Sequence, residues 1–448
     1  MNSFHHGMQH SASITGVADI NVEELQLAAK NENPPSPFQS SYSNLSGEGA
    51  RILFATDEWF AAADNLLKES PPHFDPDAYC EQGKVMDGWE SRRRREAGHD
   101  WCVIKLKSRA RLYGIEIDTA HFTGNQVPNI SLEIADLDCS QETSMVLQFP
   151  GALQRLLHGC VQGTGTSPSE VQQADAASRQ LPWRELLPKT PLRPGYEATR
   201  MHYFALSTPL EGTHVRVNYF PDGGVARLRL WGDAIDSPSP KAGPAYSPIK
   251  TGRTCTVVSH SSDEPLPSAQ PFEYPELSLL ENGGLGLACS NKHYGEPWHL
   301  IQPTLGRDMG DGWETARHPE RPSILVRHPE TGLTDSPLSD WCILKLGQVA
   351  NDGVARIILD TKHFRGNYPE SVLVEGCLAD DDEIADEDVE WFTLVPRGRM
   401  APDSEHVYER TKNQVINGAR PVSHVRVSIF PDGGVSRVRV YGAPGEKQ

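Results

Sequence analysis

The sequence contains no apolar run that approaches the roughly 20 residues a membrane-spanning helix needs. Its N-terminus, MNSFHHGMQHSASITG, lacks the basic start and apolar core of a secretory signal, and its final Glu-Lys-Gln is not a peroxisomal address. Basic residues are outnumbered, 42 against 60 acidic ones, and the net charge of −18 disfavours nucleic acid or an anionic membrane as a partner. We therefore expect a cytoplasmic protein that binds neither.

Cysteine is also sparse, and the common catalytic signatures are missing. The eight cysteines include no Cys-x-x-Cys pair, and Cys102 and Cys342 lie in matching apolar strings, which predicts buried thiols in a reducing compartment. There is no Gly-x-Ser-x-Gly, His-Glu-x-x-His, Walker loop or dinucleotide-binding loop. None of the 17 histidines has a recognised ligand spacing, so no cofactor is indicated and a divalent metal stays an open question.

What the sequence does contain is an internal duplication. FPDGGVARLRLWG at 220–232 is answered by FPDGGVSRVRVYG at 430–442, and both follow His-Val-Arg-Val. The motif Asp-Gly-Trp-Glu-[Ser/Thr]-x-Arg occurs at 87–93 and 311–317. A third motif, Asp-Thr-x-His-Phe-x-Gly-Asn, occurs at 118–125 and 360–367. The order is the same in both halves, which indicates a tandem duplication with loops of unequal length.

The duplication divides the chain. We predict a flexible tail at 1–46 with one short helix near 21–30, a first repeat at 47–232, a linker at 233–275 and a second repeat at 276–448. The offset between the repeats falls from 242 residues at the Asp-Thr-x-His-Phe-x-Gly-Asn motif to 210 at the Phe-Pro-Asp-Gly-Gly motif, so the first repeat has 32 extra residues between them. The segment GCVQGTGTSPSEVQQADAASRQ lies within this insertion, and its polar composition predicts a mobile surface loop.

Alternating apolar and polar residues predict strands in both repeats. HVRVNYF and VARLRLW have this period of two, and the Pro-Asp-Gly-Gly between them is turn chemistry, which together predict a β-hairpin in each repeat. Several short strands separated by turns favour an all-β fold with one β-sandwich or jelly roll per repeat. Alternation also places Arg227 and Arg229, and their counterparts Arg437 and Arg439, on one face, either a solvated face or an anion-binding or subunit-contact face.

Two of the shared motifs carry the polar residues that could do chemistry. Carboxylates and histidine are general acid and base candidates, arginine binds a carboxylate with a planar fork, and asparagine both donates to and accepts from an amide. The alternative is that these residues only shape turns. The candidates are Asp87, Glu90, Arg93, His121 and Asn125 in the first repeat, and Asp311, Glu314, Arg317, His363 and Asn367 in the second.

The ordered strings FATDEWFAAADNLL, GKVMDGWESRRRR, HDWCVIKL, IEIDTAHFTGN and HVRVNYFPDGGVARLRLWG resemble the allantoicase family. The resemblance covers roughly 50–232 and 276–443, with the second-half strings similar to the second repeat of that family. It implies two jelly-roll domains of the galactose-binding kind and a homo-oligomer. It also implies a hydrolase that converts allantoate to ureidoglycolate and urea in purine (allantoin) degradation.

The candidate residues suit such a substrate, since allantoate carries a carboxylate and two ureido groups on one carbon. Our sequence-based hypothesis assigns the carboxylate to Arg93 or Arg317 and a ureido group to Asn125 or Asn367. Proton transfer falls to His121 or His363 with Glu90 or Glu314. Asp87 and Asp311 complete the substrate-binding set, and a metal could instead polarise the leaving ureido oxygen.

Two alternatives and one question stay open at this point. The chain could be a non-catalytic galactose-binding-like protein, which exposed aromatic platforms would favour, or a hydrolase of a neighbouring ureide. Convergence of the polar residues in one concave pocket would favour the enzyme. The sequence does not decide between two sites, one site at the interface of the repeats, and one active site beside a relic.

Overall fold

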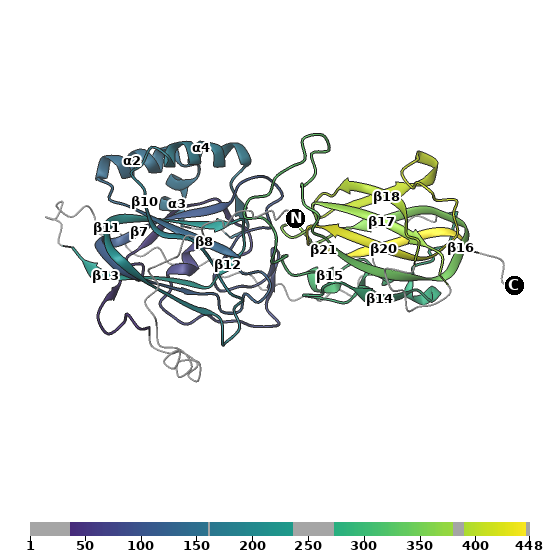
Figure 1. Cartoon of the computed structure of the whole chain (residues 1–448), viewed down its shortest axis with the longest axis horizontal. Coiled ribbons are helices and arrows are strands. Elements are labelled where there is room, and N and C mark those ends of the chain that lie inside the picture. The colour runs from purple at the N-terminus through teal and green to yellow at the C-terminus, as the bar shows by residue number, and fades with distance from the viewer. Residues whose placement is uncertain (1–35, 160–161, 236–272, 380–388, 445–448) are drawn as a thin grey trace, which may run out of the picture.

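The computed structural model describes residues 36–159, 162–235, 273–379 and 389–444. It forms two sheet-rich bodies that lie side by side (Figure 1), the first repeat in purple to teal and the second in green to yellow. The predicted short helix at 21–30, most of the predicted tail and most of the predicted linker lie outside the described residues. In the described part of the chain, no helix has the length and apolar character to cross a membrane.

The first repeat is a two-layered β-sandwich. Its seven-stranded sheet has the order β1-β13-β7-β11-β8-β10, with β2 also paired to β7. One layer pairs β2 with the first half of β7, and the other pairs β13 with the second half, so the long strands β7 and β11 contribute to both layers. The strands are β1 (Ser43–Asn44), β2 (Arg51–Ala55), β7 (Asp100–Asp118), β8 (Asn129–Ala135), β10 (Arg184–Pro191), β11 (Met201–Phe220) and β13 (Arg227–Ala234).

The second repeat follows the same plan. Strand β16 pairs with β14 and β20 through its first half and with β19 and β22 through its second, and β17 and β18 extend the sheet. Its strands are β14 (Leu285–Cys289), β16 (Asp340–Asp360), β17 (Ser371–Cys377), β18 (Phe392–Arg399), β19 (Glu405–Glu409), β20 (Val422–Phe430) and β22 (Arg437–Pro444). The prediction of an all-β chain with two tandem sandwiches is confirmed.

Alternating side chains of the strands fill the space between the layers, as the period of two requires. In the first core, Ile104 and Val217 from one layer meet Ile117 and Leu230 from the other, all essentially buried. An equivalent core fills the second repeat. Cys102 and Cys342 are both fully buried in these cores, which confirms the prediction for the two thiols.

The predicted hairpins are wrong. Strands β11 and β13 do not pair with each other but flank β7 on its two sides, and β20 and β22 flank β16 in the same way. The Pro-Asp-Gly-Gly segment carries the chain across the end of the central strand. Its second glycine, with the following valine, forms the short strands β12 (Gly224–Val225) and β21 (Gly434–Val435), which pair with β6 (Trp89–Glu90) and β15 (Trp313–Glu314). The Pro-Asp-Gly-Gly segment does end the strand before it, but it forms a bend rather than a turn, and each flanking strand pairs with the central strand.

The segment at 159–180, expected to be a mobile loop, contains helix α4 where the structure describes it, and helices α2 and α3 come just before it. Helices α2 (Cys139–Gln148), α3 (Ala152–His158) and α4 (Pro168–Ser178) cover one face of the first sandwich (Figure 1). Ser167 and Glu170 form a reciprocal capping box at the start of α4, and Ala174 is buried against the sheet. Small apolar residues among polar ones hid the buried face of this helix.

The remaining elements are short. They are the strands β3 (Asp57–Glu58), β4 (Tyr79–Cys80), β5 (Gly83–Lys84) and β9 (Thr164–Gly165), and the 3₁₀ helices η1 (Ala63–Leu67), η2 (Leu280–Asn282), η3 (Pro297–Ile301), η4 (Met309–Asp311) and η5 (Arg410–Lys412). Strand β3 pairs with β9, and β4 pairs with β5. Several of these elements carry residues of the site described next.

Candidate active site

The two repeats meet through reciprocal contacts of the same motifs. The backbone amide of Arg93 donates to the carbonyl of Gly366 at 2.9 Å, and the amide of Arg317 donates to the carbonyl of Gly124 at 2.8 Å. In each case the arginine motif of one repeat touches the Gly-Asn motif of the other. The contact is therefore pseudo-twofold, and the shared motifs lie at the interface of the repeats.

The arginine side chains cross the interface to buried carboxylates. Arg93 binds Glu314 at 2.7 Å through Nη2 and Asp432 at 2.7 Å through Nη1. Arg317 binds Glu90 at 3.0 Å and also contacts Asp222. All of these side chains are buried, and an ion pair in such surroundings is sensitive to the loss of either partner. Each repeat thus completes the ion pairs of the other.

The two asparagines belong to the same assembly. Asn125 Nδ2 donates to Glu90 Oε1 at 2.9 Å, and Asn367 Nδ2 donates to Glu314 Oε1 at 2.8 Å. Each half therefore presents a glutamate held by its own asparagine and by the arginine of the other repeat.

A pocket opens where the two halves meet. All six of these Glu, Arg and Asn side chains line it, which brings six of the ten residues singled out in the sequence into one place. Its volume is about 40 Å³, room for only a few water molecules. The other lining residues are Phe60, Lys84, Met86, His293, Tyr294 and Met309.

Three buried polar atoms of this pocket have no hydrogen-bond partner within the described residues. They are Nε2 of His293, Nε of Arg317 and Oδ1 of Asn367. Leaving a buried donor or acceptor unpaired costs about 1–3 kcal/mol, so such atoms are rare in folded proteins without a purpose. Three such atoms in one pocket leave hydrogen-bonding positions that water or a polar ligand can fill.

Burial alters the acid–base character of the lining groups. It raises the pKa of Glu90, with Glu314 adding to the rise while Arg317 and Asn125 oppose it. It lowers the pKa of His293 below its ordinary value of 6.5, although the charge of Glu314 works against this. It also lowers the pKa of Lys84. The pocket therefore combines a carboxyl that holds its proton more readily with an imidazole that is neutral near pH 7.

The other four predicted residues lie outside this pocket. His121 is exposed, has a φ of 69° and stacks on Phe74 at 5.4 Å. His363 has the same φ, and its Nε2 lies 2.8 Å from the carbonyl oxygen of Gly306. Neither histidine lines the pocket.

The two aspartates instead hold arginines of the last strands. Asp87 pairs with Arg227 at 2.7 Å, and Asp311 pairs with Arg437 at 3.1 Å. Both arginines are fully buried, so neither belongs to a solvated face or to a surface that binds anions or subunits. These ion pairs fix the Asp-Gly-Trp-Glu turn against the sheet, and they thereby position the glutamate three residues later.

Lys84, His293 and Tyr294 are pocket residues that the sequence reasoning missed. A signal for the last two was present in ACSNKHYGEPWHLI, the second-repeat string that matches FATDEWFAAADNLL only weakly. None of the three is the same residue in both repeats, so the shared motifs do not include them. In the described part of the chain no group of three or more His, Cys, Asp or Glu side chains is arranged to hold a metal.

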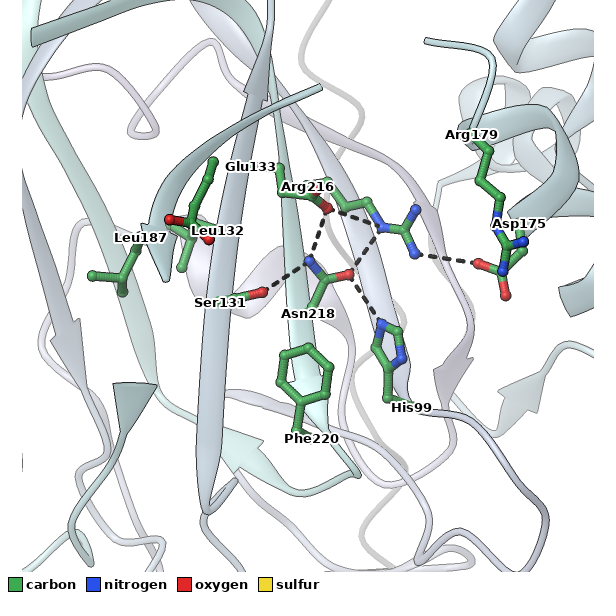
Figure 2. Close-up of a pocket in the computed structure, with 11 residues that line it drawn as sticks. His99, Ser131, Leu132, Glu133, Asp175, Arg179, Leu187, Arg216, Asn218 and Phe220 are labelled. Carbon is green, nitrogen blue, oxygen red and sulfur yellow. Dashed lines mark hydrogen bonds and ion pairs between the residues drawn. The ribbon is translucent and has the colours of Figure 1, made fainter. Parts of the chain in front are cut away.

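A second, wider pocket of about 340 Å³ lies within the first repeat, between the sheet and α4 (Figure 2). Its polar side chains largely satisfy one another. Asn218 accepts from Arg216 Nε at 2.9 Å, lies 3.2 Å from His99 Nε2 and donates to Ser131 at 3.2 Å. None of its lining atoms is among the buried side-chain atoms that lack a partner in the described residues. The pocket between the repeats is accordingly the stronger candidate for chemistry.

Comparisons with known proteins agree with the duplicated motifs. The family model described as "Allantoicase repeat" matches residues 44–235 and again 275–445. A probable allantoicase of Rhizobium meliloti (strain 1021) is 35% identical over 403 residues, covering 88% of this chain and 92% of that protein. "Probable allantoicase 2" of Burkholderia pseudomallei (strain K96243) is 32% identical over 423 residues, covering 93% and 99%. The crystal structure of allantoicase from Saccharomyces cerevisiae is 29% identical, with 95% and 98% covered and a TM-score of 0.31. The family match in both repeats and the identity of the relatives show that this chain belongs to the allantoicase family.

Proposed function

We propose that this protein is an allantoicase, which hydrolyses allantoate to ureidoglycolate and urea in purine (allantoin) degradation, and that the pocket between its repeats is the active site. The observation that carries the location is the convergence of both copies of Glu, Arg and Asn on a single pocket with unpartnered buried polar atoms. This arrangement favours an enzyme over a binding protein, because a binding platform has no need for buried acid and base candidates.

The reaction requires two proton transfers at one carbon. A water oxygen bonds to the central carbon of allantoate, and the bond from that carbon to one ureido nitrogen breaks. The departing nitrogen gains a proton to become urea, while the attacking water loses one. An acid and a base on opposite sides of the carbon therefore suffice.

The lining residues supply these roles. We assign the base to His293, whose buried imidazole is neutral, and the acid to Glu90, whose pKa is raised by burial. The amide groups of Asn125 and Asn367 complement ureido groups, and Oδ1 of Asn367 is available as an acceptor. These assignments replace the histidines suggested by the sequence with one that lies in the pocket.

We assign the substrate carboxylate to Lys84 rather than to the arginines. The Nη groups of Arg93 and Arg317 are already engaged by carboxylates of the protein. Lys84 lines the same pocket and forms no ion pair within the described residues, its Nζ contacting the carbonyl of Pro76 instead. It is thus the cation whose charge remains for an anionic substrate.

Substrate entry needs the pocket to widen, since its present volume holds only a few waters. Met309 is the side chain best suited to move. It lines the pocket and packs against Gly83, where an added Cβ would lie 2.3 Å from Met309 Cε. Its side chain is unbranched and has several rotatable bonds. A rotamer change there opens space without disturbing the ion pairs behind it.

The test is to incubate the purified protein with allantoate and to follow urea and ureidoglycolate, with and without a chelator. Stoichiometric release of both products supports the proposal, and the chelator decides whether a metal takes part. If the protein releases urea from ureidoglycolate but not from allantoate, it is a hydrolase of that neighbouring ureide and the proposal is wrong. No release from protein shown to be folded would leave a binding protein.

We further propose that the enzyme works in the cytoplasm as a homo-oligomer, with domains at 47–232 and 276–448 joined by the 233–275 linker. The free cysteines in the described part of the chain suit a reducing compartment. Sedimentation equilibrium tests the oligomer, and a mass at or near the 49.5 kDa of one chain would contradict it.

A further inference from the structure

The pocket between the repeats has a pseudo-twofold frame, made of the Glu, Arg and Asn residues that both repeats contribute, but some of its other lining residues differ between the halves. In the first repeat, Glu90 exchanges two backbone hydrogen bonds of 3.2 Å with Ala61. In the second, Glu314 exchanges bonds of 2.8 and 3.0 Å with Tyr294. The residue that precedes the bonded position is Phe60 in one half and His293 in the other. These two side chains therefore occupy equivalent places.

Their surroundings support the equivalence. A Cβ added at Gly366 would lie 2.7 Å from Phe60 Cζ, and one added at Gly124 would lie 2.8 Å from His293 Cε1. Each ring thus packs on the glycine that precedes the asparagine of the opposite repeat, and both rings line the pocket. One half of the site carries an apolar ring and the other an ionisable ring with a buried, unpartnered nitrogen.

The substrate has a matching property, because allantoate carries two identical ureido groups on one carbon. A pocket with two Glu–Asn pairs offers each ureido group the same hydrogen-bonding partners. The frame alone does not determine which group is cleaved. Only residues that differ between the halves make that choice, and Phe60 against His293 is such a difference within the pocket.

We propose that one allantoate binds with a ureido group on each Glu–Asn pair, and that His293 determines which of the two is hydrolysed. The group on Glu90 and Asn125, beside His293, leaves as urea. The group on Glu314 and Asn367, beside Phe60, is held and stays on the product. This proposal rests on the proposed function and adds an identity for each half of its site.

The step balances with the groups at hand. His293 Nε2 takes a proton from water as the water oxygen bonds to the central carbon. The carbon–nitrogen bond to the ureido group on Glu90 breaks. Glu90, in the form that carries a proton on the oxygen not bound by Arg317 and Asn125, delivers that proton to the nitrogen. Urea and ureidoglycolate result, and the proton on His293 returns to Glu90 through solvent. No oxidant, reductant or further reactant is needed.

Because Lys84 fixes the substrate carboxylate, the handedness of the product shows which ureido group was cleaved. Gly-Lys-Val-Met at 83–86 is answered by Gly-Arg-Asp-Met at 306–309, so Lys84 is matched to Arg307, which is exposed, pairs with Asp311 and does not line the pocket. Among the described residues, the lysine that holds the carboxylate therefore lines the pocket from one half only. With the carboxylate fixed, cleavage of one or the other ureido group gives opposite hands of ureidoglycolate, because its carbon carries four different groups. The handedness of the product therefore reports which half performs the cleavage.

The experiment exchanges the two rings. His293→Phe should lower turnover of allantoate by about two to four decades, since it removes a general base. The double variant F60H/H293F should regain turnover and release ureidoglycolate of the opposite hand to that from the unmodified protein. Phenylalanine and histidine each already occupy one of the two equivalent places, which limits the risk of misfolding. His328→Phe, a substitution outside the pocket, is the matched control and should keep both rate and product.

Each contrary outcome has a definite meaning. If His293→Phe keeps its turnover, or if the exchange variant is folded but inactive or releases the same hand of product, the assignment of the halves is overturned. Calorimetry of allantoate with His293→Phe should give one molecule bound per chain, and two would overturn the shared pocket. Failure of the unmodified protein to release urea from allantoate would instead sink the proposed function itself.

Discussion

The most demanding stability prediction concerns Asp432, which anchors the interface of the repeats. Its side chain is fully buried. One oxygen lies 2.7 Å from Arg93 Nη1 and 3.6 Å from Arg95, and the other accepts from the backbone amide of His318 at 2.8 Å. Asp432→Asn keeps the shape of the side chain but removes its charge. The positive charges of Arg93 and Arg95 then stay buried without the negative charge that balances them.

The size of the effect follows from this geometry. Loss of one partner of a buried ion pair costs about 3–5 kcal/mol, because the remaining charge cannot return to water. Burial alone would raise the pKa of Asp432, but Arg93, Arg95 and Arg321 outweigh it and hold the pKa well below its ordinary value of 3.8. We therefore expect Asp432→Asn to lower the free energy of unfolding at pH 7 by about 3–5 kcal/mol.

The dependence on pH has a definite sign. Because the pKa is lower in the folded state, the charged form stabilises the fold in full above the unfolded value of 3.8, and this contribution is lost as the pH falls towards the folded pKa. The difference between the unmodified protein and Asp432→Asn should thus be constant near neutrality. It should shrink below pH 3.8.

The assay is urea unfolding followed by tryptophan fluorescence, with an exposed ion pair as the control. Arg365 and Glu81 also join the two repeats, at 2.9 Å, but Glu81 is 70% exposed. Glu81→Gln should therefore cost no more than about 1 kcal/mol. The reasoning is refuted if Asp432→Asn costs no more than this control, or if its effect does not decrease in acid.

Four further predictions address the site itself. Glu90→Gln should reduce turnover by about two to four decades, and it should also lower stability because it removes a buried partner of Arg317, so urea release is measured per folded protein beside thermal unfolding. The acid limb of kcat/KM should titrate below pH 6.5, because burial lowers the pKa of His293 and only the neutral ring accepts a proton; a limb above that value would contradict this. Gly124→Ala should impair turnover, since the new methyl group would lie 2.8 Å from His293, and normal kinetics would refute this packing. His121→Asn and His363→Asn should keep near-normal rates, because asparagine tolerates the φ of 69° and both side chains lie outside the pocket; a large loss would restore their catalytic assignment.

The fold was accessible from the sequence where local pattern and physics coincide. Alternation in HVRVNYF and VARLRLW correctly identified strands, because each face of a sandwich strand meets a different environment. The hairpins were wrong because period and turn chemistry say where a strand ends but not which strand it pairs with. The prediction for the segment around α4 was wrong because the buried face of that helix consists of small residues, Ala174, Ala177 and Ser178, which composition alone does not distinguish from a loop.

The candidate site was predictable to the same extent. Comparison of the copies selected Glu90, Arg93 and Asn125 with their counterparts, all of which lie in the pocket, because a shared frame leaves the same residues in both repeats. The same comparison also selected the two aspartates, which hold buried arginines, since structural ion pairs are duplicated as faithfully as chemistry. It could not find His293, which exists in one copy only.

The proposed shared pocket gives a reason why a duplicated chain would have one site rather than two. Arg93 completes the ion pair of Glu314, and Arg317 completes that of Glu90, so neither repeat contains a full set on its own. In a shared pocket, two equivalent positions can carry different residues, because the Glu, Arg and Asn side chains common to both repeats hold the pocket together. Phe60 and His293, which occupy equivalent places, differ in this way. A substrate with two equal arms gains from a symmetric frame for binding, but its hydrolysis needs that symmetry broken, and this pocket provides both.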